Sequence, residues 1–206
     1  MIRNTIYMIK DAAGGQDSAL DRPIARMERS IARCDRIVEE LLDYTRVRDL
    51  HCVSIAADRW LDDVLAECEL PESVALVRKL AAPSCRLSAD PDRLRQVVVN
   101  LIENAAQAMK ELDPAKERLI IVSSRTKDDA FEFSIEDTGP GIPHEYLAKI
   151  FEPLFTTKSF GTGLGLPIVK QIVERHGGAV EIASEPGRGT VVVVRLPRVA
   201  AKEMAA

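Results

Sequence analysis

The chain has 206 residues, 46% of them hydrophobic, with 11 glycines and 11 prolines. This composition is typical of a globular protein of one or two domains and excludes a fibrous or disordered chain. The net charge of −4 disfavours binding to nucleic acid. No apolar run approaches the roughly 20 residues that cross a bilayer, and the N-terminal residues lack the apolar region and cleavage site of a signal peptide. We therefore expect this chain to be cytoplasmic and without membrane contact, and a membrane anchor elsewhere in the intact protein is left open. The four cysteines form no CxxC pair, so we expect core thiols in a reducing compartment.

A long helix is predicted from about residue 20 or 21 to about residue 48. Apolar residues spaced alternately by three and four form one stripe along it, which comprises Leu20, Ile24, Met27, Ile31, Cys34, Val38, Leu41 and Thr45. Ile37 and Leu42 widen the stripe as in a helical bundle. Because proline is tolerated in a first turn, Pro23 indicates that the helix begins just before it.

A shorter helix is predicted before the long one. Ile2, Ile6, Ile9 and Ala13 repeat the apolar spacing, and residues 14–18 break the pattern. Residues 1–50 therefore resemble a helical hairpin with one short arm. Either the first helix is truncated, or a second chain covers the rest of the long helix.

From residue 51 the pattern changes to short strands mixed with amphipathic helices, up to about residue 198. Strands are predicted at 52–55, 73–80, 85–88, 119–125, 131–136, 179–184 and 191–196, and helices at 57–66, 92–112 and 166–176. These elements predict an α+β sandwich in which helices lie on one face of a mixed sheet. Residues 137–165 read as a long functional loop, and residues 199–206 as a tail.

One helix carries polar amides on a single face. Asn100, Asn104 and Gln107 are spaced by four and three in residues 100–108 (NLIENAAQA). An amide oxygen is a hard ligand that can complete the shell of Mg²⁺ beside phosphates. Alternatively, these side chains are merely solvated or bonded to their own helix.

Three further motifs follow in the chain: residues 137–142 (DTGPGI), 150–158 (IFEPLFTTK) and 161–166 (GTGLGL). A carboxylate such as Asp137 can accept the amine of adenine, and glycines permit close approach of a base. Phe151 and Phe155 are by default core anchors. Consecutive amides at the start of a helix can bind phosphate, although the P-loop and dinucleotide fingerprints are absent.

In this order the four motifs resemble the N box, first glycine box, F box and second glycine box of sensor histidine kinases. The match covers residues 90–196, and residues 40–47 (ELLDYTRV) look like the second helix of that family's dimerisation and phosphotransfer hairpin. The resemblance implies an ATP-binding domain, a homodimer through the hairpin, and a response-regulator receiver domain as partner. Truncation of the first helix is then the economical explanation of the short arm.

The resemblance also implies residue roles. Asn104 would hold Mg²⁺, supported by Asn100, and Asp137 would bind adenine, with Thr190 close to the base. Gly139, Gly141 and Ile142 would shape the base pocket, Gly163, Leu164 and Gly165 would bind phosphates, and residues 144–162 would form a short lid. The nucleotide-binding set is completed by Gln107, Ala108, Phe155, Thr157, Lys158, Thr162 and Leu166. Asn104 and Lys158 are the candidate catalytic residues.

Two positions depart from the family pattern. No histidine lies in the first helical stretch, because the chain has only His51, His144 and His176, so we expect Mg-ATP binding without autophosphorylation. We interpret His176 as a helix cap and the other two as solvated. Gln107 stands where many relatives have a lysine, which makes Lys158 the candidate partner of the γ-phosphate, with Lys110 second.

Two other functions remain open for this sequence. One is a dimeric, catalytically silent module that senses nucleotide. The other is an ATP hydrolase of the gyrase type, which the sequence disfavours because Asn100 occupies the position of the glutamate that activates water in those enzymes.

Overall fold

The protein is analysed as a computed structural model, which describes residues 18–45, 49–110, 112–113, 116–158 and 161–198. The chain divides into two compact units, residues 1–47 and residues 48–206. Among the described residues, no helix combines the length and the apolar character needed to span a bilayer.

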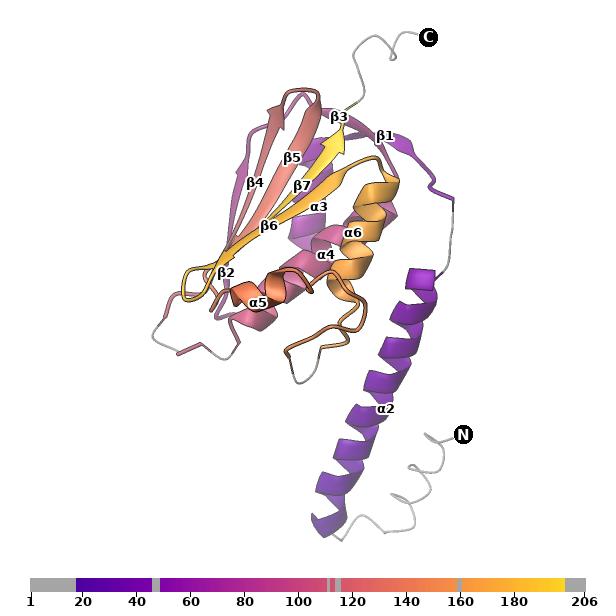
Figure 1. Cartoon of the computed structure of the whole chain (residues 1–206), viewed down its shortest axis with the longest axis vertical. Coiled ribbons are helices and arrows are strands. Elements are labelled where there is room, and N and C mark those ends of the chain that lie inside the picture. Colours follow the sequence, from indigo (N-terminus) through magenta and orange to yellow (C-terminus); the bar gives the residue numbers. More distant parts are fainter. Residues whose placement is uncertain (1–17, 46–48, 111, 114–115, 159–160, 199–206) are drawn as a thin grey trace. The chain divides into compact units, whose positions relative to one another are not determined.

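The first unit contains α2, Ser18–Thr45 (Figure 1). The helix begins earlier than expected, so Pro23 lies in its second turn and the prediction that Pro23 marks the first turn is wrong. A proline inside a helix removes the hydrogen bond of its own nitrogen and crowds the carbonyl one turn earlier, yet α2 continues through Pro23 to Thr45. Of the predicted apolar stripe, Ile24 is buried, whereas Met27, Val38 and Leu41 are exposed. The predicted preceding helix lies outside the described residues.

The second unit is an α+β sandwich, as predicted. Its elements are β1 (Val53–Ala56), α3 (Ala57–Glu67), β2 (Ala75–Leu80), β3 (Arg86–Ala89), α4 (Pro91–Ala108), β4 (Leu119–Lys127), β5 (Ala130–Asp137), α5 (His144–Leu147), α6 (Gly165–Arg175), β6 (Ala179–Glu185) and β7 (Gly189–Pro197). Five strands form a mixed sheet in the order β2-β4-β5-β7-β6, and β1 pairs with β3 separately. The pairing of β2 with β4 is parallel, and the other pairings are antiparallel.

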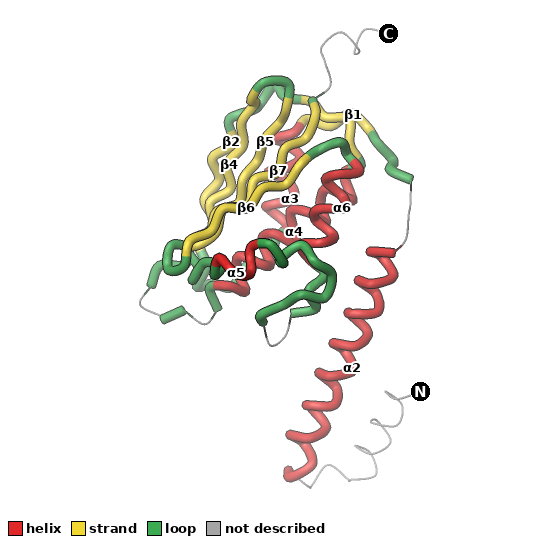
Figure 2. The backbone as a smooth tube through the Cα atoms, in the orientation of Figure 1, coloured by secondary structure: helices red, strands yellow, loops and turns green. Residues whose placement is uncertain are grey.

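Helices α3, α4 and α6 lie on one face of this sheet (Figure 2). Alternation along β5 turns Phe131, Phe133 and Ile135 toward the helices, where all three are buried. The buried face of α4 consists of Leu94, Val97, Val98, Leu101, Ile102 and Ala105, and α4 also packs against α6. This burial holds α4 under the centre of the sheet and leaves its amide-bearing face free of the core.

Helix α4 ends at Ala108, four residues before the predicted end. Met109 caps the helix with its side chain fully buried, and the carbonyl oxygen of Leu112 accepts a hydrogen bond from the Arg118 guanidinium at 2.8 Å. The backbone that would extend the helix is therefore engaged in the turn that leads to β4.

The prediction that all four cysteines are core thiols is wrong. Cys85 is buried, Cys68 is half-buried, and Cys34 and Cys52 are exposed. Cys34 belongs to the stripe of α2 and Cys52 to the segment before β1. The apolar spacing places these residues on a helical stripe or next to a strand, but it does not show whether anything covers them.

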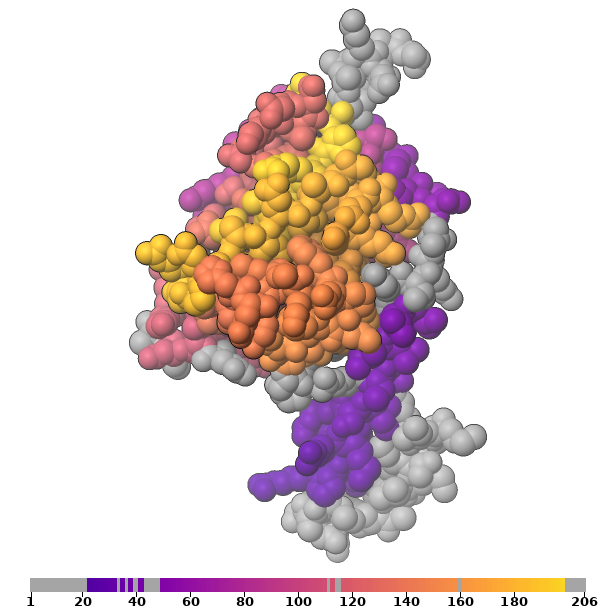
Figure 3. Space-filling view, viewed as in Figure 1, coloured from indigo at the N-terminus to yellow at the C-terminus, as the bar shows by residue number. Residues whose placement is uncertain are grey.

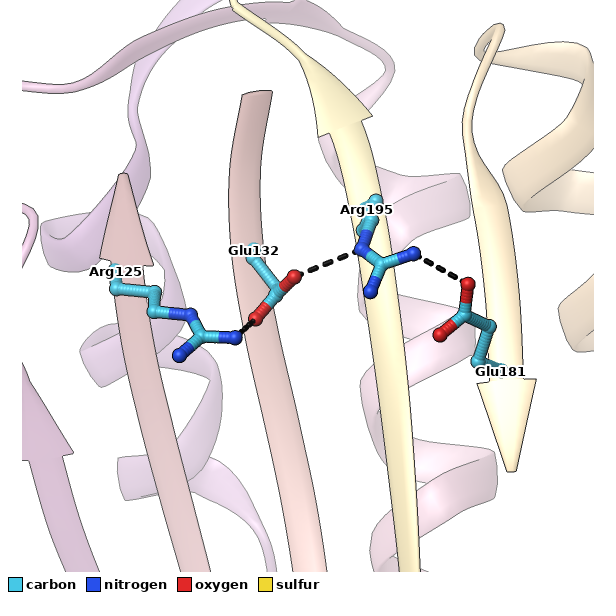
Figure 4. A network of polar contacts seen from close by, with 4 residues as sticks. All are labelled: Arg125, Glu132, Glu181 and Arg195. Atoms are coloured by element: carbon cyan, nitrogen blue, oxygen red, sulfur yellow. Dashed lines mark hydrogen bonds and ion pairs between the residues drawn. The ribbon is translucent and has the colours of Figure 1, made fainter. Parts of the chain in front are cut away.

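The outer face of the sheet carries a chain of charges across four strands (Figure 4). The Glu132 carboxylate contacts Arg125 on β4 and accepts a 2.8 Å hydrogen bond from Arg195 on β7, which also contacts Glu181 on β6. The side chain of Glu132 is 5% exposed and that of Glu181 is 60% exposed. Burial alone would raise the pKa of Glu132, but the two arginines outweigh it and lower the pKa.

We expect Glu132→Gln to lower the free energy of unfolding by roughly 1 to 3 kcal/mol at pH 7, because two arginines lose a buried anionic partner. The depressed pKa makes this stabilisation complete above the unfolded pKa of about 4.3, and it is lost as the pH falls through the folded pKa. Urea unfolding at pH 7 and near pH 4 should show the gap to wild type narrowing in acid. The control Glu181→Gln breaks an exposed ion pair and should lower the free energy of unfolding by less than about 1 kcal/mol. Equal losses in the two variants would contradict the conclusion that the buried Glu132 carries the stabilisation.

Candidate functional site

The amide face of α4 lies against the first residue of α6. The Asn100 side-chain nitrogen donates to the Gln96 carbonyl at 2.9 Å, which orients its amide. A Cβ atom added to Gly165 would lie 3.3 Å from the Asn100 side-chain oxygen and 3.5 Å from the Asn104 side-chain nitrogen. The amides of α4 therefore adjoin the N-terminus of α6, whose first amide hydrogens are unpaired within the helix and attract anions.

Lys158 joins the loop after α5 to the end of α4. Its ammonium nitrogen lies 3.3 Å from both the backbone oxygen and the side-chain oxygen of Asn104, and 3.4 Å from the side-chain oxygen of Gln107. A cation is favoured at the C-terminus of a helix. Burial lowers the pKa of Lys158, while the charge of Asp137 opposes this shift. The amide oxygen proposed to bind a metal thus already faces a positive charge.

Asp137 is the last residue of β5 and its side chain points into the sandwich. It is 7% exposed, and its carboxylate accepts a hydrogen bond from the Gly139 amide at 2.8 Å. Burial raises the pKa of Asp137, although the backbone amides of Gly139 and Thr190 and the charge of Lys158 act in the opposite direction. A buried carboxylate of this kind is a strong acceptor for an amino group of a ligand.

The glycine-rich loop after β5 rests on the β6–β7 hairpin. Gly141 has φ +72°, and a Cβ atom there would overlap the carbonyl oxygen of Glu185. The Gly187 amide donates to the Pro140 carbonyl at 2.7 Å, and the Ile142 amide donates to the Ser184 hydroxyl at 2.8 Å. Gly139 is required by its neighbours as well, because a Cβ atom there would lie 2.5 Å from the Asp137 carboxylate and 3.4 Å from Ala108 Cβ.

The sequence prediction did not include Ser184. Its hydroxyl lies 2.9 Å from the Gly189 carbonyl oxygen and 2.9 Å from the Thr190 hydroxyl. A signal was available, because Val180, Ile182 and Ser184 alternate along β6 toward the helices, and a polar residue in an inward series requires a partner. The sequence analysis singled out Thr190 alone on this hairpin.

The F box and the second glycine box are packed on each other. The Leu154 amide donates to the Gly163 carbonyl at 3.0 Å, and both residues have positive φ angles, +67° and +73°. A Cβ atom on Gly163 would lie 2.5 Å from the Leu154 backbone. The Leu164 side chain is fully buried, so its backbone, and not its side chain, faces the loop.

The long loop differs from the prediction in containing a one-turn helix, α5. Pro143 precedes it with φ −56°, the value that proline imposes and that suits entry into a helix. The Tyr146 ring of α5 lies 5.8 Å from the Phe155 ring. Phe151 and Phe155 are half-buried, not fully buried core anchors. Figure 3 shows this segment in orange beside the β6–β7 hairpin.

The remaining predicted residues are placed as follows. Thr157 is exposed and Gln107 is exposed at the edge of the site, whereas Ala108, Thr162 and Leu166 are half-buried. The Thr162 hydroxyl accepts a hydrogen bond from the Leu164 amide at 3.4 Å. The structure thus brings Asn100, Asn104, Gln107, Lys158 and Gly165 together, and separately Asp137, Gly139, Ile142 and Thr190.

His176 is a structural residue, as the sequence analysis interpreted it. It caps α6, and its Nδ1 lies 2.8 Å from the Ile172 carbonyl oxygen. Its Nε2 accepts the Asp90 amide at 3.0 Å, so the ring proton resides on Nδ1. Gly177 follows with φ +72°, and Gly178 donates back to Val173, which completes a Schellman cap. His51 and His144 are exposed.

Known proteins share these motifs in sequence. Residues 89–200 match the family described as histidine kinase-, DNA gyrase B- and HSP90-like ATPases. The chain is 36% identical over 175 residues to the sensor histidine kinase ZraS of Klebsiella oxytoca, which covers 83% of this chain and 37% of that relative. The chain therefore spans less than half the length of this curated relative.

Solved structures of histidine kinases share the fold. Full-length ShkA in complex with AMPPNP aligns with a TM-score of 0.72 at 25% identity, which covers 90% of this chain and 40% of that one. ThkA in complex with the response regulator protein TrrA aligns with the same TM-score and identity, over 96% of this chain and 60% of that one.

We expect Gly189→Ala to lower the free energy of unfolding by about 3 kcal/mol or more. Gly189 has φ +95°, and a Cβ atom there would overlap the Asp137 carbonyl oxygen, so both strain and a backbone clash arise. The control Gly187→Ala meets only strain, because nothing lies within 4 Å of a Cβ there at φ +82°, and it should cost about 1 kcal/mol. Urea unfolding of both variants tests this; similar costs would show that the hairpin relaxes around Gly189.

Proposed function

The chain belongs to the family of histidine kinase-, DNA gyrase B- and HSP90-like ATPases, and from this premise we propose that residues 51–198 bind Mg-ATP as the catalytic unit of a two-component sensor histidine kinase. The observation that carries the proposal is the pairing of two chemically different clusters on α4 and its neighbours. One cluster joins Asn104, Lys158 and the start of α6. The other joins Asp137, Gly139 and Thr190.

The cluster around Asp137 suits adenine. An ionised carboxylate accepts the exocyclic amine of the base, and the close approach of Gly139 to Asp137 and Ala108 leaves no room there for another side chain. Gly141 and Ile142 continue this wall, held by the β6–β7 hairpin. We assign adenine binding to these residues.

The cluster around Asn104 suits a magnesium triphosphate. The Asn104 side-chain oxygen is a hard ligand. It already accepts a hydrogen bond from the Lys158 ammonium, so this oxygen is directed toward positive charge. Asn100 supports the amide face from one turn earlier, with Gln107 at its other end. The backbone amides of Gly163, Leu164 and Gly165 would bind phosphates at the N-terminus of α6. Thr157, Thr162, Phe155 and Leu166 would complete the wall.

Phosphoryl transfer needs positioning and neutralisation of charge more than covalent help from the protein. Magnesium supplies charge neutralisation when it is bound. Lys158 would hold the γ-phosphate, Asn104 would orient the metal, and the amides at the start of α6 would hold the remaining oxygens. Hydrolysis is not favoured, because Asn100 is a neutral amide bonded to its own helix and Glu103 is exposed.

The whole protein is proposed to transfer the γ-phosphoryl group to a histidine and then to a response-regulator receiver domain. In support, the related ThkA has been crystallised with a response regulator protein. The exposed apolar residues of α2 support a homodimer through residues 1–50. No histidine precedes α2 in this chain, and the His176 ring is engaged, so we expect this chain to bind ATP without autophosphorylating.

We expect Asp137→Asn to weaken Mg-ADP binding by about 10- to 100-fold, because the adenine amine loses a charge-assisted acceptor. Isothermal titration calorimetry measures this directly. The raised pKa of Asp137 also predicts that wild-type affinity falls as the pH drops through that pKa, whereas the affinity of Asp137→Asn responds less.

The matched control is Asp129→Asn. Asp129 lies in the turn between β4 and β5, and its exposed carboxylate pairs with Arg198, which follows β7. This variant should bind Mg-ADP as wild type does. The proposal fails if the folded wild-type chain shows no binding heat with ATP or ADP in the presence of magnesium.

Lys158→Ala should weaken ATP binding by about tenfold or more and ADP binding by much less, because the ammonium is assigned to the γ-phosphate. Calorimetry with both nucleotides gives the two losses. Lys110→Ala, which removes an exposed cation just beyond α4, is the control and should change neither affinity. Equal losses for ATP and ADP in Lys158→Ala would remove the γ-phosphate assignment.

A further inference from the structure

Ser184 stands at the junction of three parts of the site. It is buried on the edge strand β6, and its hydroxyl contacts Ile142 in the loop after β5, the backbone of Gly189 and the hydroxyl of Thr190. The contact distances are 2.8, 2.9 and 2.9 Å respectively. A serine hydroxyl has one proton and two lone pairs, so these three contacts use its whole capacity.

The chemistry of the three partners determines the direction of each hydrogen bond. The Ile142 amide can only donate and the Gly189 carbonyl can only accept. The single Ser184 proton therefore goes to Gly189, and the remaining Ser184 lone pair receives the proton of Thr190. All three contacts are satisfied only in this arrangement. It leaves the Thr190 oxygen with lone pairs and no available proton.

Thr190 lies directly opposite Asp137 in the pairing of β5 with β7. Both side chains are buried on the same face of the sheet, with exposures of 9% and 7%. The deep end of the site therefore presents two acceptors, a carboxylate and a hydroxyl oxygen whose proton is directed away.

We propose that Ser184 is a positioning residue that makes Thr190 an acceptor and thereby selects adenine over guanine. The inference rests on the proposed nucleotide function. Two acceptors complement the amino group that adenine carries at C6, and they repel the carbonyl oxygen that guanine carries there. Ser184 also fixes Ile142, so the same hydroxyl couples the shape of the first glycine-rich loop to the polarity of the pocket.

The test compares Mg-ADP and Mg-GDP binding by calorimetry in wild type and in Ser184→Ala. Without Ser184 the Thr190 hydroxyl rotates and can donate to a carbonyl, so we expect the ADP-to-GDP affinity ratio to fall by about tenfold or more. Ser184→Thr keeps the hydroxyl and should preserve the ratio. Ser134→Ala, on the outer face of β5, which is separated from β6 by β7, is the control and should behave as wild type.

A residue that only stabilised the fold would weaken both nucleotides equally and leave the ratio unchanged, so an unchanged ratio in folded Ser184→Ala overturns the proposal. If Ser184→Ala does not fold, Thr190→Val decides, because it removes the acceptor directly: a lowered ratio supports the proposal and a wild-type ratio overturns it. Where both variants fold, adding Ser184→Ala to Thr190→Val should leave the ratio unaltered. Wild type that binds neither ADP nor GDP would overturn the proposed function itself.

Discussion

Burial of the apolar face of α4 beneath the sheet and against α6 is the interaction on which the site depends. Six fully or nearly fully buried residues hold the helix in place, and burial of apolar surface stabilises a fold by about 25 cal/mol per Å². The same orientation turns Asn100, Asn104 and Gln107 toward Gly165 and Lys158. The packing of α4 in the core therefore also fixes the positions of the site residues on its other face.

The two ends of the site differ in electrostatic character. At one end the start of α6 and the Lys158 ammonium are positive, and the C-terminal turn of α4 receives that ammonium. At the other end Asp137 is a buried carboxylate that accepts a hydrogen bond from the Gly139 amide. A nucleotide has this polarity, with phosphates at one end and an amino-bearing base at the other. Under the proposed function, each end would exclude the wrong part of the nucleotide by charge or by the direction of its hydrogen bonds.

Backbone constraints hold the anionic end in place. Gly189 lies directly against Asp137, and Gly141 lies directly against Glu185, so the hairpin β6–β7 and the loop after β5 approach more closely than side chains would permit. Ser184 then joins the same two segments by hydrogen bonds. The outer face of the sheet has a different role. There the buried Glu132 and its two arginines join β4, β5 and β7, whereas the site residues lie on the inner face.

The order and spacing of the motifs led to the family by resemblance, and the periods of helices and strands, which are local properties, predicted the sandwich. The sequence patterns located β5, β7 and α6 to within two residues, and the motifs supplied Asp137, Asn104 and Lys158 as the residues now proposed to bind nucleotide. Contacts between distant segments were not accessible in this way. The Lys158 contact spans 54 residues and the Ser184 contact 42, and the end of α4 and the exposure of Cys52 depend on what packs nearby. Such features arise from packing in three dimensions, where the partner of a polar atom is settled by strand register and helix placement and not by its neighbours along the chain.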